Sequence, residues 1–170
     1  SEHGLKPIRI HIWHDWIFLN FNGKAKKFEE YAKPLIKRFK DINLTKLKYV
    51  ATLDFGKINT NWKFLIENFI EPYHVQFVHK KTTKQPLKDH YTFVDGKCYG
   101  SGVDIEEEDE KNNSALSVTS RYLSLFPNFI MGTYFPNQVG VYLNIPISPG
   151  ITSQKRIIYT TDGKDMTKKE

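Results

Sequence analysis

The stretch "NWKFLIENFIEPYHVQFVHK", residues 61–80, combines a helical pattern of apolar side chains with acids, an amide and two histidines. At about 100° per residue, Glu67, Glu71 and His74 fall on nearly the same face of a helix. Burying such groups without partners would cost several kcal/mol. We therefore predict a helix over about residues 61–73, capped by Asn59 or Thr60, whose polar side faces water or a ligand.

The two histidines of this stretch, His74 and His79, are five residues apart. On a regular helix that spacing turns them about 140° away from each other, whereas zinc-binding helices of the H-E-x-x-H type place their histidines four apart. Pro72 has no N–H to bond back to Asn68, so we expect the last turn to be loosened. The pair could then bind one metal ion. Alternatively, two histidines at a helix C-terminus complement the helix dipole, and the spacing leaves both interpretations open.

The rest of the chain is predicted to be mostly strands separated by turns. "KPIRIHIWHDWIFLNFNG" predicts two strands around a turn, and a helical pattern over about residues 25–42 is divided or kinked by Pro34. Residues 80–89 are predicted to be a loop and residues 107–113, "EEDEKNN", an acidic turn. Further strands are expected at residues 46–56, 90–106, 114–120, 128–135, 139–148 and 155–161, with turns at 95–96, 136–137 and 149–150.

The composition predicts a globular domain of ordinary size. The 170 residues are 39% hydrophobic and 14% aromatic, and the net charge is +6. The lysines are scattered rather than gathered in one stripe, which argues against nucleic acid as a partner. No apolar run approaches the length of a membrane span and no signal-peptide pattern opens the chain, which argues against a membrane. The one cysteine, Cys98, excludes an internal disulfide and a thiolate-bound cluster, and we expect it to be a small strand residue in a cytoplasmic protein.

The order of residues in the opening stretch is more specific than its periodicity. The pattern N-W-K, then E-N, E, Y-H and a later H resembles the iron-site helix of the Rieske non-haem iron oxygenases, in the catalytic domain of their large (alpha) subunit. "PIRIHIWHDWIFLNF" resembles the strands that follow the Rieske cluster domain, "LSLFPNFIMGTYFP" resembles the mid-sheet segment, and "PISPG" resembles the proline-rich turn. The resemblance covers nearly the whole chain, in order.

The resemblance implies a role for each polar residue of the stretch. His74 and His79 match the two imidazole ligands of a mononuclear Fe(II). Glu71 matches the acid between the iron helix and the cluster of a neighbouring subunit, where it orients histidines and helps to pass an electron. Asn68 matches an amide near the iron, and Tyr73 lies between the acid and the first histidine, so these three are the expected catalytic residues.

The resemblance also implies the fold and the domain plan. We expect an α+β helix-grip (START/Bet v 1-like) fold, in which a curved antiparallel sheet wraps around a long helix. Residues 1–22 would be the strands that follow an absent Rieske domain, and residues 23–170 a partial catalytic domain. The cluster motif C-x-H…C-x-x-H is absent, so the [2Fe–2S] cluster would lie outside this chain. The third iron ligand is not evident; Asp162 and Asp165 are candidates, as is a carboxylate beyond Glu170.

By the same resemblance, the expected activity is O2-dependent hydroxylation or demethylation of a small organic substrate. Electrons would come from NAD(P)H through a reductase or ferredoxin, in a homotrimer or hetero-oligomer. Residues 80–89 could form a lid. The alternatives are a metal-free helix-grip domain that binds an apolar molecule, and a zinc hydrolase. The candidates for lining the substrate pocket are Phe64, Phe77, Phe129, Met131 and Tyr142.

Overall fold

The computed structural model describes residues 4–79, 90–109, 114–134 and 137–160. Its contacts divide the chain into two units, residues 1–45 and 46–170, and each unit is described by itself below. Within the described residues, no helix is long and apolar enough to cross a membrane.

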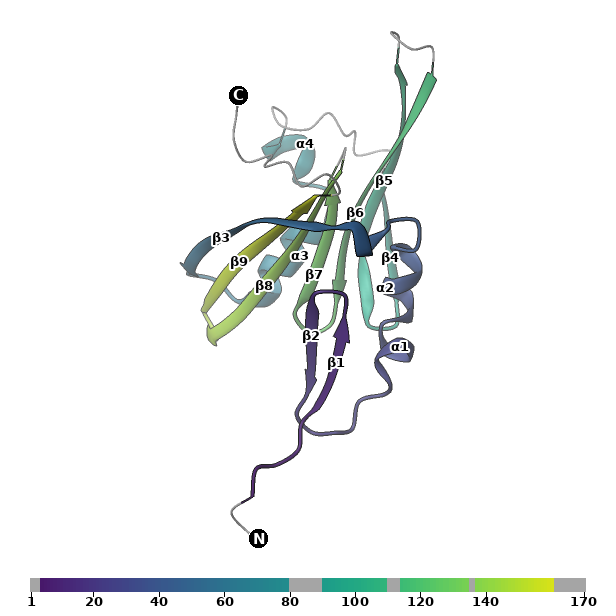
Figure 1. Ribbon diagram of the computed structural model, residues 1–170. Coiled ribbons are helices and arrows are strands. Elements are labelled where there is room, and N and C mark those ends of the chain that lie inside the picture. The colour runs from purple at the N-terminus through teal and green to yellow at the C-terminus, as the bar shows by residue number, and fades with distance from the viewer. Residues whose placement is uncertain (1–3, 80–89, 110–113, 135–136, 161–170) are drawn as a thin grey trace. The chain divides into compact units, whose positions relative to one another are not determined.

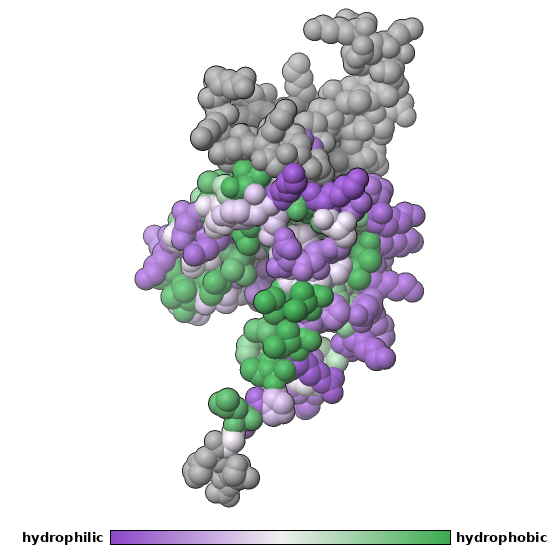
Figure 2. Space-filling view, in the orientation of Figure 1, coloured by the Kyte–Doolittle hydropathy of each residue, from purple (hydrophilic) through white to green (hydrophobic). Residues whose placement is uncertain are grey.

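Unit 1 opens with the predicted hairpin, formed by β1 (Arg9–Trp13) and β2 (Trp16–Asn20). The register pairs Ile10 with Leu19 and Ile12 with Ile17, so these four side chains share one face of the hairpin. Each of them is more than half exposed, and they form the apolar surface seen over β1 and β2 in Figure 2. The turn between the strands contains His14, which has a positive φ of 52°.

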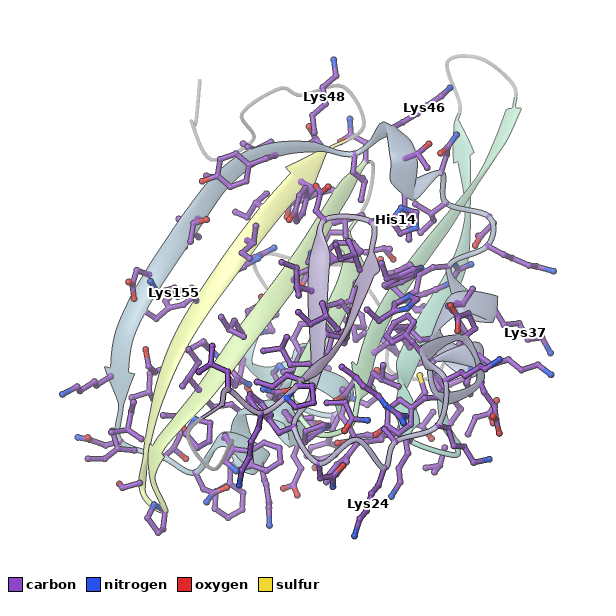
Figure 3. The ribbon with its side chains drawn as sticks, turned by 60° about the horizontal axis from the view of Figure 1, so that its bottom comes forward. His14, Lys24, Lys37, Lys46, Lys48 and Lys155 are labelled. Atoms are coloured by element: carbon purple, nitrogen blue, oxygen red, sulfur yellow. The ribbon has the colours of Figure 1, made fainter. Side chains whose placement is uncertain are left out.

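The helical segment of unit 1 is divided, as Pro34 predicts. It forms α1 (Phe28–Tyr31) and α2 (Lys33–Arg38), with Pro34 in the first turn of α2, and both helices are shorter than the predicted span. Phe28 packs on the other face of the hairpin, with ring centroids 4.2 Å from His11 and 4.5 Å from Phe18. Lys37 extends outward from α2 (Figure 3). A short 3-10 helix, η1 (Leu44–Lys46), leads into unit 2.

Unit 2 is built on a seven-stranded antiparallel sheet of order β3-β9-β8-β7-β6-β5-β4, which Figure 1 shows from one side. The strands β4 to β9 follow one another as a meander, and β3 pairs with β9 at the opposite edge from β4. The strands are β3 (Lys48–Ile58), β4 (His90–Asp95), β5 (Cys98–Asp109), β6 (Ser114–Leu125), β7 (Phe129–Tyr134), β8 (Gln138–Ser148) and β9 (Ile151–Thr160).

The connection from β3 to β4 joins the two edges of this sheet and therefore has to cross it. It contains α3 (Trp62–Ile70) and α4 (Val75–Val78). The helix α3 packs against β5, β6 and β8, which places it on one face of the sheet. The fold is thus α+β, with an antiparallel sheet and few helices, and the predicted class is confirmed at that level.

Two of the predicted pocket residues lie on the other face of the sheet. A Cβ built on Gly132 of β7 would be 2.9 Å from Phe69 Cζ, so Gly132 faces α3. Because side chains alternate along a strand, Phe129 and Met131 point away from α3, and Met131 is fully buried there. The two helical candidates, Phe64 and Phe77, are more than half exposed. Tyr142 contacts α3 from the sheet, through Phe69.

The acidic stretch at residues 107–113 is not wholly a turn. Residues 107–109 continue β5 and pair with residues 114–116 of β6, because the strand hydrogen bonds run to the end of this long hairpin. The predicted turns at 95–96 and 149–150 connect β4 to β5 and β8 to β9. Residues 80–89, 110–113 and 136 lie outside the described residues. Cys98 is a buried residue of β5, as predicted.

Candidate metal centre

The start of α3 is fixed to the turn between β8 and β9. The helix is capped by Asn61, whose Oδ1 accepts a hydrogen bond from the Lys63 N–H at 3.0 Å. Its Nδ2 donates to the carbonyl oxygen of Pro149 at 2.7 Å. The predicted cap at Asn59 or Thr60 is therefore wrong by one or two residues, because Asn61 both caps the helix and binds this turn.

The end of α3 comes three residues earlier than predicted. The helix stops at Ile70, and Glu71 is extended, with φ −85° and ψ 133°. Pro72 explains this, since its ring disfavours the helical conformation of the residue before it. The predicted polar stripe consequently does not run along one helix. Glu67 and Asn68 are exposed on α3, whereas Glu71 and His74 lie past its end and are partly buried.

The carboxylate of Glu71 binds His74 at two places. Its Oε1 forms a short hydrogen bond with the ring Nδ1 of His74, and its Oε2 accepts from the backbone N–H of His74 at 3.2 Å. The two side chains are 38% and 20% exposed, respectively. The contact thus fixes both the backbone and the ring of His74. With Nδ1 held by the carboxylate, Nε2 is the ring nitrogen left to bind another group.

The second histidine is brought to the first by a single helical turn. His74 and His79 are the N-cap and C-cap of α4, whose backbone bonds include Val78 N–H to the His74 carbonyl at 2.7 Å and His79 N–H to the Val75 carbonyl at 3.0 Å. The two imidazole rings have centroids 5.1 Å apart and planes inclined by 71°. The rings are therefore neighbours rather than on opposite sides of a helix.

This separation fits two imidazoles around one ion. Metal–nitrogen bonds of about 2.0–2.1 Å place each ring centroid about 3 Å from the ion, and two such rings lie about 4.5–5 Å apart. The contact between Nδ1 and a carboxylate is also the usual support of a metal-binding histidine, because it orients the ring and makes the other nitrogen more basic. The residues present thus fit a mononuclear metal.

The described residues do not complete a ligand set. Among them, no three His, Cys, Asp or Glu side chains are grouped closely enough to hold an ion. Asp162 and Asp165 lie outside the described residues. Tyr73 is largely exposed and packs against Phe77, with ring centroids 5.2 Å apart. His79 is exposed at the end of α4.

A second polar group, which sequence analysis did not single out, lies beneath α3. Phe69 contacts Tyr142 of β8 and Tyr122 of β6, with ring centroids at 4.9 and 5.8 Å. Tyr142 in turn lies beside Tyr134 and the guanidinium of Arg156. No local sequence pattern marks this group, because Arg156 follows Gln154 and Lys155 in a polar part of its strand.

Comparison with protein families identifies the class of domain that this α+β fold forms. The sequence model of the ring hydroxylating alpha subunit (catalytic domain) matches residues 37–167. This chain belongs to that family, the catalytic domains of Rieske-type oxygenase large subunits. The family resemblance seen in the sequence is confirmed.

Two curated relatives and several solved structures agree with this assignment. The chain is 27% identical to the large oxygenase component of salicylate 5-hydroxylase from Ralstonia sp over 82% of its length, and 24% identical to chloroplastic choline monooxygenase of Arabidopsis thaliana over 88%. It spans 38% of the length of each. In structure it is similar to a quaternary ammonium Rieske monooxygenase (TM-score 0.76, 18% identity, 93% of this chain and 44% of that one). It is also similar to naphthalene 1,2-dioxygenase, with a TM-score of 0.66 and 14% identity over 94% of this chain and 45% of that one.

Proposed function

We propose that this chain supplies the mononuclear iron site of an oxygenase that hydroxylates or demethylates a small organic substrate. His74 and His79 are the two imidazole ligands. The observation that supports this most is the apposition of the two rings, 5.1 Å apart, together with the carboxylate that holds Nδ1 of His74. Fe(II) bound by two histidines and one carboxylate retains open positions for O2 and substrate.

The other residues around the histidines would act through position and charge. Glu71 holds the ring of His74 so that Nε2 faces the ion, and its negative charge favours a cationic metal–imidazole unit. Asn68 and Tyr73 flank this acid along the chain, and we assign them to the vicinity of the iron by the family pattern. The third ligand is a carboxylate supplied from beyond Glu170, and Asp162 and Asp165 are the alternatives within this chain. The sheet and α3 would form the helix-grip arrangement around the substrate.

The chain would work within a longer subunit. Residues 1–22 would follow a Rieske domain, and its [2Fe–2S] cluster would receive electrons from NAD(P)H through a reductase or ferredoxin. Electron transfer between subunits has been described for the quaternary ammonium monooxygenase, and we propose a homotrimer or hetero-oligomer here as well. A cytoplasmic location stays a prediction. The purified 170-residue chain, with one cysteine, should show no coupled O2 consumption with NADH and reductase, because it cannot bind the cluster.

The test is an anaerobic Fe(II) titration of the complete subunit and its histidine variants. His74→Ala and His79→Ala should each abolish iron binding at this site. His90→Ala, which removes an imidazole from the start of β4, is the matched control and should bind iron like the wild type. Iron binding that survives both His74→Ala and His79→Ala, or is lost only in His90→Ala, would refute the assignment.

A further inference from the structure

The guanidinium of Arg156 in β9 lies among polar and aromatic groups of β8, the adjacent strand, and of β7, the strand after that. Its Nη2 donates a hydrogen bond to Gln138 Oε1 at 2.8 Å. Its Cζ is 4.7 Å from the ring centre of Tyr134 and 5.4 Å from that of Tyr142. The two tyrosine hydroxyl oxygens are 3.4 Å apart. A cation and two hydroxyls therefore share one small region of the sheet.

This region is on the face of the sheet that α3 covers. A Cβ on Gly140 of β8 would be 3.1 Å from Arg156 Nε, so the guanidinium lies directly over this glycine. Gly140 pairs across the strands with Gly132, the residue that lies under Phe69 of α3. Paired residues point to the same face. Arg156 and Phe69 of α3 thus lie over paired glycines of neighbouring strands, on the same face of the sheet.

The positive charge of Arg156 has no anionic partner in the described part of the chain. Its side chain contacts the Gln138 amide and the two tyrosine rings, and Nε is buried without a hydrogen-bond partner. Arg156 is partly buried, and its contacts with aromatic faces offset only part of the cost of removing a cation from water. A bound anion would remove that cost.

The neighbouring tyrosine does not supply the negative charge. Burial raises the pKa of Tyr134 well above its ordinary value, and the adjacent Tyr142 raises it further, against the opposing effect of Arg156. Tyr134 is therefore a neutral phenol at physiological pH. In that form its O–H is a hydrogen-bond donor, which complements an anion rather than replacing it.

Resting on the oxygenase function proposed above, we propose that Arg156 binds the carboxylate of an organic-acid substrate, with the hydroxyls of Tyr134 and Tyr142 beside it. A guanidinium binds a carboxylate with two parallel hydrogen bonds. One hydrogen of Nη2 already bonds to Gln138, so the N–H groups of Nη1 and the other hydrogen of Nη2 would donate to the carboxylate. The acid group would anchor the substrate on the sheet, and the rest of the molecule would extend along α3 towards its histidine end. The substrate class is thus a small carboxylic acid.

The test compares acids with their neutral amides in the metal-free complete subunit. Benzoate with benzamide, and hexanoate with hexanamide, are titrated by calorimetry after chelation of iron, so that the carboxylate cannot bind the metal. At least one acid should bind about tenfold or more tightly than its amide, because only the acid gains the charged pair. Arg156→Gln should abolish this preference and leave amide binding in place, and Arg156→Lys should retain part of it. Lys155→Gln is the control: it removes the same charge one residue away, from a side chain bonded to Asp54 at 3.3 Å.

The pH dependence of acid binding distinguishes a guanidinium from a histidine as the binding group. The acid preference should stay constant between about pH 6 and 9, because a guanidinium remains charged, whereas binding by a histidine would weaken through about pH 6.5. The inference is overturned if neither acid outbinds its amide in the wild type, or if the preference survives Arg156→Gln. Iron binding is scored separately. Acid preference without iron binding at His74 and His79 refutes only the oxygenase assignment, and iron binding without acid preference refutes only the role of Arg156.

Discussion

The contact between Glu71 and His74 should strengthen metal binding by His74, and its loss should lower the metal affinity by a measurable amount. The carboxylate accepts two hydrogen bonds from one residue, at the ring Nδ1 and at the backbone N–H of His74. In Glu71→Gln the side chain keeps one oxygen but replaces the other with an NH2 group, which cannot accept. When Nε2 binds the metal, Nδ1 carries the ring proton, so one of the two contacts is lost, together with the negative charge that favours the metal-bound imidazole.

The size of the effect follows from the partial burial of the pair. Changes to groups that support a metal-binding histidine typically weaken metal binding by about 10–100-fold. Because the Glu71 side chain is 38% exposed, water can replace part of what is lost. We therefore expect Glu71→Gln to fall near the lower limit, about tenfold or about 1.4 kcal/mol. Glu71→Ala removes both contacts and should approach the upper limit.

The assay is an anaerobic Fe(II) titration of the complete subunit, with the dissociation constant read by competition with a coloured chelator. Glu67→Gln is the matched control, because it makes the same chemical change at an exposed carboxylate one helical turn earlier. It should bind Fe(II) like the wild type. Equal affinities for Glu71→Gln and Glu67→Gln would show that the Glu71 carboxylate does not support a metal ligand.

Three further changes test the fold around the site. Gly132→Ala places a methyl group 2.9 Å from Phe69 Cζ and should lower the free energy of unfolding by about 1–3 kcal/mol, as measured by urea denaturation; an unchanged midpoint would contradict this packing. Asn61→Ala removes the α3 cap and should cost about 1–2 kcal/mol in the same assay. Asp54 has a lowered pKa, first because of a backbone N–H bond and then because of Lys155. The ionised Asp54 carboxylate therefore stabilises the folded protein fully above about pH 3.9, the pKa of an unfolded Asp. This stabilisation is lost as the pH falls through the lower pKa that Asp54 has in the folded protein. In an NMR titration, Lys155→Gln should raise that pKa only in part.

The sequence predicted the strands well because their signal is local. Alternation of apolar side chains and turn residues such as those at 95–96 and 149–150 is contained within a few neighbouring positions. The residue that caps α3 was harder to predict from the sequence, since Asn59, Thr60 and Asn61 are all residue types that cap helices. Asn61 is distinguished from the other two by its hydrogen bond to the carbonyl oxygen of Pro149, which is far along the chain. The surroundings of Arg156 were missed for the same reason, because they depend on the register of three strands.

The histidine pair shows why a helical projection alone gave the wrong geometry. On a continuous helix, a spacing of five residues separates His74 from His79, and the projection groups His74 with Glu67 instead. Pro72 forces the preceding residue into an extended conformation and ends α3 there. A new turn, α4, then begins at His74 and ends at His79, so the two rings meet across one turn. The break in the backbone, rather than a shared helical face, is what brings these side chains together. A search for metal sites that considers only four-residue histidine spacings on unbroken helices would therefore pass over a pair of this kind.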